Sequence, residues 1–91
     1  MIGEIKFQAK IVKAMEARGF YVIRLRSTDK AGIADLLCLK HCHVIFIEVK
    51  GVKGKIAPLQ QYRADEQKER GFKHYFTFEG DNFLKEIVPK L

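Results

Sequence analysis

The sequence contains few cysteines and no long uninterrupted hydrophobic stretch. Cys38 and Cys42 are the only two cysteines among 91 residues, so a disulfide-stapled secreted scaffold is excluded. The longest apolar run is far shorter than the ~20 residues that cross a bilayer, and no segment resembles a signal peptide. We therefore expect a cytoplasmic protein with reduced thiols and no membrane contact.

Acidic residues are scarce relative to basic ones. The chain has 11 Asp and Glu against 17 Lys and Arg, which gives a formal net charge of +6. The excess lies in the first 56 residues, because residues 57–91 carry six residues of each sign. A basic surface of this kind favours a polyanionic partner such as nucleic acid, and a solvated basic surface without a ligand is the alternative interpretation.

Periodicity and turn residues predict a single domain over residues 1–91 with the element order αβββαβα. The expected elements are a helix over 3–18, strands over 20–26, 34–39 and 44–50, a helix over 57–70, a strand over 72–78, and a short helix capped by Asp81 or Asn82 and ended by Pro89. A chain of this length has an expected radius of gyration of roughly 12 Å.

Eight basic residues are candidates for contact with DNA phosphates. In the first helix, a spacing of i, i+4 and i+7 places three lysines in one stripe, opposite Ile11 and Met15. The others end the first strand, lie in the polar loop after it, or lie in the glycine-containing segment 51–55. The eight are Lys6, Lys10, Lys13, Arg24, Arg26, Lys30, Lys53 and Lys55.

The same helix carries a carboxylate on its apolar side. At 100° per residue, Glu4 points in the same direction as Ile11 and Met15. Two interpretations remain open. Glu4 either stabilises the positively charged helix N-terminus or faces a functional site.

The hairpin formed by the second and third strands gives the main functional inference. If its turn is centred between His41 and Cys42, the register places Asp35 opposite Glu48, and Lys50 projects from the same face as Glu48. Opposed carboxylates repel each other, but a hard divalent cation such as Mg²⁺ or Mn²⁺ would stabilise them. Such a cation can activate water for attack on a phosphodiester, assisted by the lysine. A surface ion-pair network is the alternative.

A zinc site near the same turn is a weaker hypothesis. The spacing of its candidate ligands does not match the usual pairs of zinc ligands. The candidates are Cys38, His41, Cys42 and His43.

The order and spacing of these residues resemble those of the VRR-NUC family of PD-(D/E)XK nucleases. The resemblance runs from Glu4 to about Phe78 and is carried by Gly32-x-x-Asp35, Glu48-Val49-Lys50 and Leu59-Gln60. The chain departs from the family pattern at Ala34, where Pro is frequent, and at Ala57, where a capping Ser is common. The resemblance implies an α/β, restriction-endonuclease-like fold, with an αβββαβ(α) core and a central mixed sheet flanked by helices.

The resemblance also implies roles for individual residues. Asp35, Glu48 and the Val49 carbonyl would bind the metal, and Glu4 would join them directly or through water. Lys50 would be the catalytic lysine, and Gln60 would orient this lysine or the attacking water. Gln60 has a structural alternative as half of a capping box, although Ala57 offers no hydroxyl to complete it.

The expected function is metal-dependent, structure-selective hydrolysis of phosphodiester bonds in branched DNA such as Holliday junctions. Stand-alone family members resemble Holliday-junction resolvases and act as homodimers, so the resemblance implies a homodimer and is compatible with a nucleoid-associated, phage or mobile-element protein. The neutral carboxyl-terminal third is the expected region of contact between copies. Two alternatives remain open, namely a basic nucleic-acid-binding module that does not cut, and a nuclease subunit that needs a partner for specificity.

Overall fold

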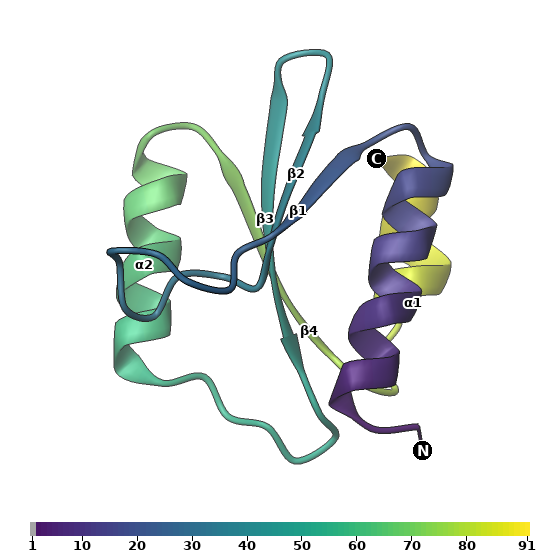
Figure 1. Cartoon of the computed structure of the whole chain (residues 1–91), viewed down its shortest axis with the longest axis horizontal. Coiled ribbons are helices and arrows are strands. Elements are labelled where there is room, and N and C mark those ends of the chain that lie inside the picture. Colours follow the sequence, from purple (N-terminus) through teal and green to yellow (C-terminus); the bar gives the residue numbers. More distant parts are fainter. Residues whose placement is uncertain (1) are drawn as a thin grey trace.

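A four-stranded sheet forms the centre of the protein, and helices lie on both of its faces (Figure 1). The computed structural model describes residues 2–91. Its elements are α1 (Glu4–Ala17), β1 (Tyr21–Arg24), β2 (Leu36–Lys40), β3 (His43–Lys50), α2 (Pro58–Glu69), β4 (Lys73–Phe78), a π-helical turn η1 (Phe83–Ile87) and a 3₁₀ turn η2 (Val88–Lys90). The predicted α/β class and element order are confirmed, and the radius of gyration is 12.4 Å.

The sheet is mixed and has the strand order β1-β2-β3-β4. β1, β2 and β3 are antiparallel neighbours, whereas β4 runs parallel to β3 after the crossover through α2. The β2–β3 register pairs Leu36 with Ile47 and Lys40 with His43, which confirms the predicted register. His41 and Cys42 have positive φ values of 47° and 67°, as a two-residue type I′ turn requires.

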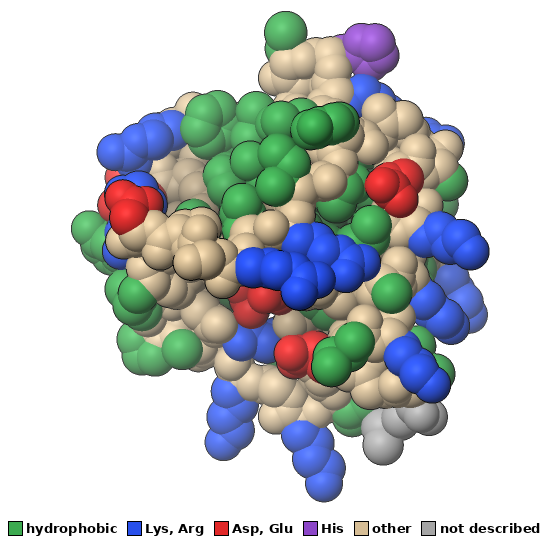
Figure 2. Space-filling view, viewed as in Figure 1, with side chains coloured by type: hydrophobic (Ala, Val, Ile, Leu, Met, Phe, Trp, Pro, Cys, Tyr) green, Lys and Arg blue, Asp and Glu red, His purple; other side chains and the backbone are tan. Residues whose placement is uncertain are grey.

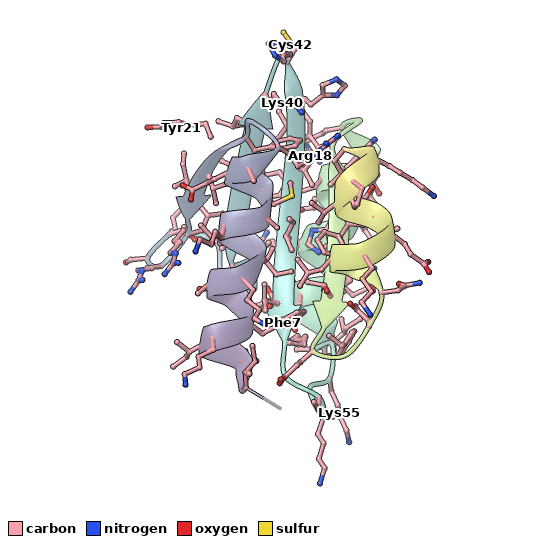
Figure 3. All side chains as sticks on the ribbon, turned by 90° about the vertical axis from the view of Figure 1, so that its right-hand side faces the viewer. Phe7, Arg18, Tyr21, Lys40, Cys42 and Lys55 are labelled. Carbon is pink, nitrogen blue, oxygen red and sulfur yellow. The ribbon has the colours of Figure 1, made fainter. Side chains whose placement is uncertain are left out.

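The sheet face toward α1 forms the main hydrophobic core. Figure 3 shows α1 and the C-terminal turns lying side by side over this face. Because side chains alternate along a strand, the buried face of β3 consists of Ile45, Ile47 and Val49, and the intervening residues point to the opposite face. The buried core residues are Phe7, Ile11, Met15, Phe20, Leu36, Cys38, Ile45, Ile47, Val49, Phe83 and Val88.

The opposite face of the sheet is only partly covered. α2 packs against β4 on this side and buries Ala64 and Gln67. On the edge strand β1, Tyr21 is 71% exposed and Ile23 is 37% exposed. Figure 2 shows hydrophobic side chains gathered in the upper half of its view, with basic side chains directly below them. The residues that carry the chemistry lie on this partly open face.

The C-terminal segment differs from its prediction. The helix was expected to end at Pro89, but Pro89 lies inside the 3₁₀ turn η2. Proline lacks an N–H, and near the start of a helical turn no N–H is needed for an internal hydrogen bond, so the chain continues. Of the two predicted caps, Asp81 accepts a hydrogen bond from the Phe83 N–H at 3.0 Å, whereas Asn82 makes no side-chain capping bond.

The described helices include none with the length and apolar character needed to span a membrane.

The first two predicted strands were each two residues too long at the ends that flank the loop between them. β1 ends at Arg24 and β2 begins at Leu36, so the polar loop between them is longer than expected. Asp35 is the last residue of this loop and directly precedes β2.

Candidate active site

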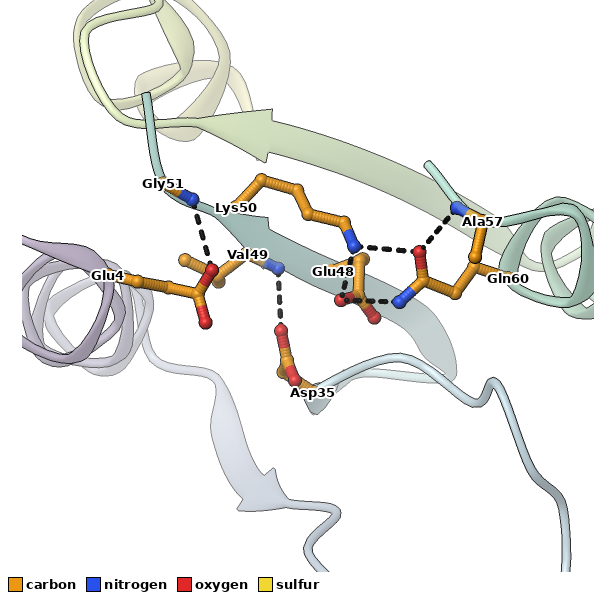
Figure 4. Close-up of polar contacts among 8 residues, drawn as sticks. All are labelled: Glu4, Asp35, Glu48, Val49, Lys50, Gly51, Ala57 and Gln60. Carbon is orange, nitrogen blue, oxygen red and sulfur yellow. Dashed lines mark hydrogen bonds and ion pairs between the residues drawn. The ribbon is translucent and has the colours of Figure 1, made fainter. Parts of the chain in front are cut away.

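Asp35 and Glu48 lie beside each other where the β2–β3 ladder ends (Figure 4). Asp35 directly precedes Leu36, whose partner is Ile47, so the register continues to Asp35 opposite Glu48. The Asp35 carbonyl accepts a hydrogen bond from the Leu25 N–H at 2.8 Å. Its Oδ2 accepts one from the Val49 N–H, also at 2.8 Å. Both the backbone and the carboxylate of Asp35 are therefore fixed.

Glu48 is a buried carboxylate with polar partners. Glu48 is only 5% exposed. Its Oε2 lies 3.6 Å from Lys50 Nζ and 3.3 Å from Gln60 Nε2. Burial, together with the neighbouring Asp35 carboxylate, raises the pKa of Glu48 to about 7, and Lys50 opposes the shift. Two neighbouring carboxylates in a poorly solvated position favour a proton or a cation between them.

Gln60 joins three parts of the site through one amide. Its Oε1 accepts hydrogen bonds from Lys50 Nζ at 2.7 Å and from the Ala57 N–H at 2.9 Å. Its Nε2 donates to Glu48 Oε2. The structure therefore places Gln60 in both of its expected environments. It provides half of a capping box at the start of α2, and it contacts the lysine and the carboxylate.

Glu4 approaches the same end of β3 from the other side of the sheet. Its Oε1 accepts a hydrogen bond from the Gly51 N–H at 3.1 Å, and its side chain is exposed. Glu4 also lies in the first turn of α1. Its position is therefore compatible with both interpretations, stabilisation of the helix N-terminus and proximity to a functional site. Within residues 2–91, however, no three Asp, Glu, His or Cys side chains are close enough to form a metal site by themselves.

The donors present fit a hard divalent cation. Mg²⁺ is usually bound through one or two carboxylates and keeps several water ligands, so it does not require a third protein carboxylate. In the contacts described above, Asp35 uses Oδ2 and Glu48 uses Oε2. The Val49 N–H points to Asp35, and in an extended strand the carbonyl of the same residue points to the same edge. Two carboxylates therefore lie side by side, and the Val49 carbonyl faces the same edge of β3 as its N–H.

Two glycines allow loops to approach these residues closely. Gly32 has φ 81°, and a Cβ there would lie 2.7 Å from Leu59 Cγ. A Cβ on Gly54 would lie 2.8 Å from Lys50 Cβ. The segment 51–55 was expected to contact phosphate, and the structure shows that it turns tightly, because the Gly54 N–H donates to the Gly51 carbonyl at 3.0 Å. Sequence reasoning did not identify Gly54 as a neighbour of Lys50.

The eight basic candidates are all exposed. The stripe of Lys6, Lys10 and Lys13 lies on the outer side of α1, away from its buried residues. Lys55 extends from the end of the molecule opposite the hairpin tip, as Figure 3 shows. These positions leave every one of the eight cationic groups open to solvent.

The zinc candidates are separated by burial. Cys38 belongs to the core, and burial raises the pKa of its thiol to about 12. His41, Cys42 and His43 are exposed at the hairpin tip.

His74 is buried, and its Nδ1 donates to Gln67 Oε1 at 2.6 Å. Sequence reasoning missed this pairing because it joins a helix and a strand with no local pattern.

Comparison with solved structures identifies the fold. A solved structure described as "VRR_NUC domain" matches with a TM-score of 0.77 and 22% sequence identity, covering 94% of this chain and 94% of that chain. No protein-family model matches the chain, and no curated protein matches it. The restriction-endonuclease-like fold that the motifs predict is therefore confirmed.

Proposed function

We propose that this protein is a VRR-NUC-type, metal-dependent endonuclease that hydrolyses phosphodiester bonds in DNA. The observation that carries the proposal is the neighbouring pair Asp35 and Glu48, with Lys50 beside it, in a VRR_NUC fold. A pair of neighbouring carboxylates, one of them buried, lowers stability unless a proton or a cation lies between them. A structural ion-pair network would not require two adjacent carboxylates on a partly open sheet face.

In this proposal Asp35, Glu48 and the Val49 carbonyl hold Mg²⁺ or Mn²⁺, and Glu4 contributes directly or through water. The bound ion would supply Lewis acidity toward the phosphoryl oxygen and lower the pKa of a water. Val49 donates to Asp35 at 2.8 Å, so this carboxylate needs little reorganisation to bind a ligand. The buried position of Glu48 limits competition from solvent.

Lys50 is assigned as the catalytic lysine. Its ammonium is held 2.7 Å from Gln60 Oε1 and 3.6 Å from Glu48 Oε2, which fixes it beside the carboxylate pair. From this position the lysine can orient the attacking water or stabilise negative charge that develops on the phosphoryl group. As a neutral amine it can also act as the general base that takes a proton from this water. Gln60 acts as a positioning residue because it orients both Lys50 and Glu48.

The proposed substrate is branched DNA, with four-way junctions as the main candidate. Eight exposed basic side chains provide sequence-independent contacts to phosphates. We propose that two copies act as a homodimer, because a two-fold pair of sites would cut opposed strands at a fixed spacing. The expected contact region is the neutral segment 57–91, which forms α2, β4 and the C-terminal turns.

The deciding experiment is a cleavage assay on linear duplex, flap and four-way DNA with Mg²⁺ or with EDTA. Wild type should cut only with the metal. Lys50→Ala should lose cleavage and keep most of its DNA affinity, because other basic groups contact the phosphates. Lys85→Ala, which removes an exposed lysine on η1, should behave like wild type. DNA binding without cleavage in wild type would favour the non-catalytic module instead.

A further inference from the structure

A cavity of about 270 Å³ lies beside α2, apart from the carboxylate pair. It is bounded by the loop after β1, by β3, by the second half of α2 and by the segment that joins α2 to β4. Its lining residues are Lys30, Ile33, Phe46, Glu66, Gln67, Arg70 and Phe72. Pockets for drug-sized ligands begin at ~300 Å³, so this cavity suits one flat ring system rather than a larger ligand.

The apolar part of the cavity is aromatic. The rings of Phe46 and Phe72 have centroids 6.4 Å apart and are tilted by 47°. Phe72 is 40% exposed although it is a large hydrophobic side chain. An accessible phenyl ring at the mouth of a small cavity provides a surface on which a planar heterocycle can stack.

The polar part of the cavity is cationic at its edge. Lys30 and Arg70 line it, and the one carboxylate, Glu66, already pairs with Arg63 Nη1 at 2.9 Å. Gln67 is 7% exposed, and its Nε2 has no hydrogen-bond partner within residues 2–91. An aromatic wall, a buried amide and two cations are the groups that bind the ring, the edge and the phosphates of a nucleotide.

The position of the cavity relates it to the proposed active site. Phe46 precedes Glu48 by two residues on the same face of β3, a separation of about 7 Å. On α2, Gln67 follows Gln60 by seven residues, or about 10 Å along the helix axis. The cavity is therefore within reach of the nucleotides next to a phosphate held at Asp35 and Glu48.

We propose that this cavity binds an unpaired nucleobase of the DNA substrate, close to the scissile phosphate. The inference rests on the proposed nuclease function and deepens it by naming the structural feature that is recognised. The base stacks on Phe72, and Lys30 and Arg70 contact the flanking phosphates. A base within a duplex must first leave its stack, whereas a base at a branch point does so at little cost. The cavity thereby provides a source of preference for branched DNA that does not depend on sequence.

The test measures binding in EDTA, so that no DNA is cut. The probe is a branched DNA with 2-aminopurine at the unpaired position, compared with the same DNA carrying an abasic site there. Wild type should change the 2-aminopurine fluorescence and should bind the abasic DNA about tenfold more weakly. Phe72→Ala should bind the base-bearing DNA about tenfold more weakly and should no longer distinguish the two DNAs. Phe72→Trp should restore the difference.

Tyr21→Ala is the matched control, because Tyr21 is an exposed aromatic residue on the same sheet face that does not line the cavity. It should distinguish the two DNAs as wild type does. Equal affinity of wild type for both DNAs would overturn the proposal. A second result would also overturn it. If Phe72→Ala changes the mass measured by light scattering and lowers the affinity for both DNAs equally, the cavity belongs to a contact between copies.

The two proposals fail in different ways. If wild type cuts DNA with Mg²⁺ but shows no dependence on the unpaired base, the cavity assignment is wrong and the nuclease assignment stands. If wild type neither binds nor cuts any of the DNAs, both are wrong.

Discussion

Gly32 packs directly against Leu59, with no space for a side chain between them. A Cβ on Gly32 would lie 2.7 Å from Leu59 Cγ and 3.0 Å from the Leu59 carbonyl carbon and oxygen. Asp35 follows Gly32 by three residues, and Gln60 follows Leu59 directly. The contact therefore holds the loop that carries Asp35 against α2. This helix carries Gln60, whose Oε1 accepts a hydrogen bond from Lys50 Nζ.

We expect Gly32→Ala to lower both stability and cleavage. The φ of 81° at this position costs an L-residue about 1–2 kcal/mol, and the added methyl group must also displace Leu59. Movement of Leu59 would shift Gln60 and loosen its 2.7 Å contact with Lys50. Denaturant unfolding measures the first effect, and the cleavage rate at saturating Mg²⁺ measures the second.

Gly80→Ala provides the matched control. Gly80 has φ 93°, and a Cβ there would meet no atom within 4 Å. The variant should lose about as much stability as the backbone strain alone requires, and its cleavage rate should remain that of wild type. Equal loss of activity in the two variants would show that the Gly32–Leu59 contact has no special effect on the site.

The hairpin register could be predicted from the sequence because it depends on local rules. The turn at His41 and Cys42 fixes which residues face each other, and the two-residue period places Glu48 and Lys50 on one face. Gln60 was assigned from the resemblance to the VRR-NUC pattern, in which Leu59-Gln60 stands at the start of a helix. These signals lie within short segments, so a single sequence contains them.

The contacts between distant segments could not be predicted in the same way. The Gly32–Leu59 packing and the Gln67–His74 hydrogen bond depend on how α2 lies on the sheet. The expectation that Pro89 ends a helix was wrong because it assumed an α-helical interior, whereas η2 is a 3₁₀ turn. Such features follow from tertiary packing rather than from local sequence patterns.

The metal assignment predicts a charge-dependent change in stability. Wild type should show a higher Tm with Mg²⁺ or Mn²⁺, and Asp35→Asn should lose this response, because it removes one charge while keeping an acceptor for the Val49 N–H. Without metal, Asp35→Asn should be more stable than wild type by up to about 1 kcal/mol, since the repulsion with Glu48 is relieved. Thermal unfolding with and without metal measures both effects.

Asp29→Asn is the control for this measurement, because Asp29 is an exposed aspartate in the loop that leads to Asp35. Its Tm should rise with metal as in wild type. An equal metal response in wild type and Asp35→Asn would remove the assigned site.

The lysine stripe on α1 predicts a change in the salt dependence of DNA binding. Replacement of Lys6, Lys10 and Lys13 by Gln should reduce the slope of log K against log salt concentration by about 0.9 for each phosphate that these lysines neutralise. Fluorescence anisotropy over a range of salt concentrations gives this slope. The same number of charges removed at Lys68, Lys85 and Lys90, which are also exposed, should change it less. Equal slopes for the two triple variants would indicate that the stripe does not bind DNA specifically.

The proposed homodimer predicts paired cuts. Light scattering of the purified protein should give twice the mass of the 10.5 kDa chain. Cleavage mapping on immobile four-way junctions should show nearly symmetric cuts in opposed strands, because a two-fold axis fixes the distance between the sites. A monomer that cuts linear duplex as fast as junctions would contradict both expectations and leave the metal-nuclease proposal intact.

His74 predicts a loss of stability in acid. Burial, together with the nearby Lys68, lowers the pKa of its imidazole to about 4 from its ordinary 6.5, and Asp65 opposes the shift. Between these two values the unfolded chain binds a proton that the folded protein does not, so the free energy of unfolding falls as the pH falls. The full contribution is about 3 kcal/mol between pH 7 and pH 4.

His74→Asn should remove this contribution while keeping a donor to Gln67. Its free energy of unfolding at pH 7 should be lower than that of wild type, because the variant lacks the packing of the His74 ring against Phe76, but it should fall less steeply toward pH 4. Glu48 contributes to the pH dependence of the free energy of unfolding with the opposite sign, because its pKa is raised. The contribution of His74 is therefore given by the difference between the wild-type and His74→Asn curves, and not by either curve alone. His43→Asn, which replaces an exposed histidine beside the hairpin turn, should keep the pH dependence of wild type. Parallel curves for wild type and His74→Asn would mean that the folded protein protonates His74 as readily as the unfolded chain does, and that its burial against α2 carries no electrostatic cost.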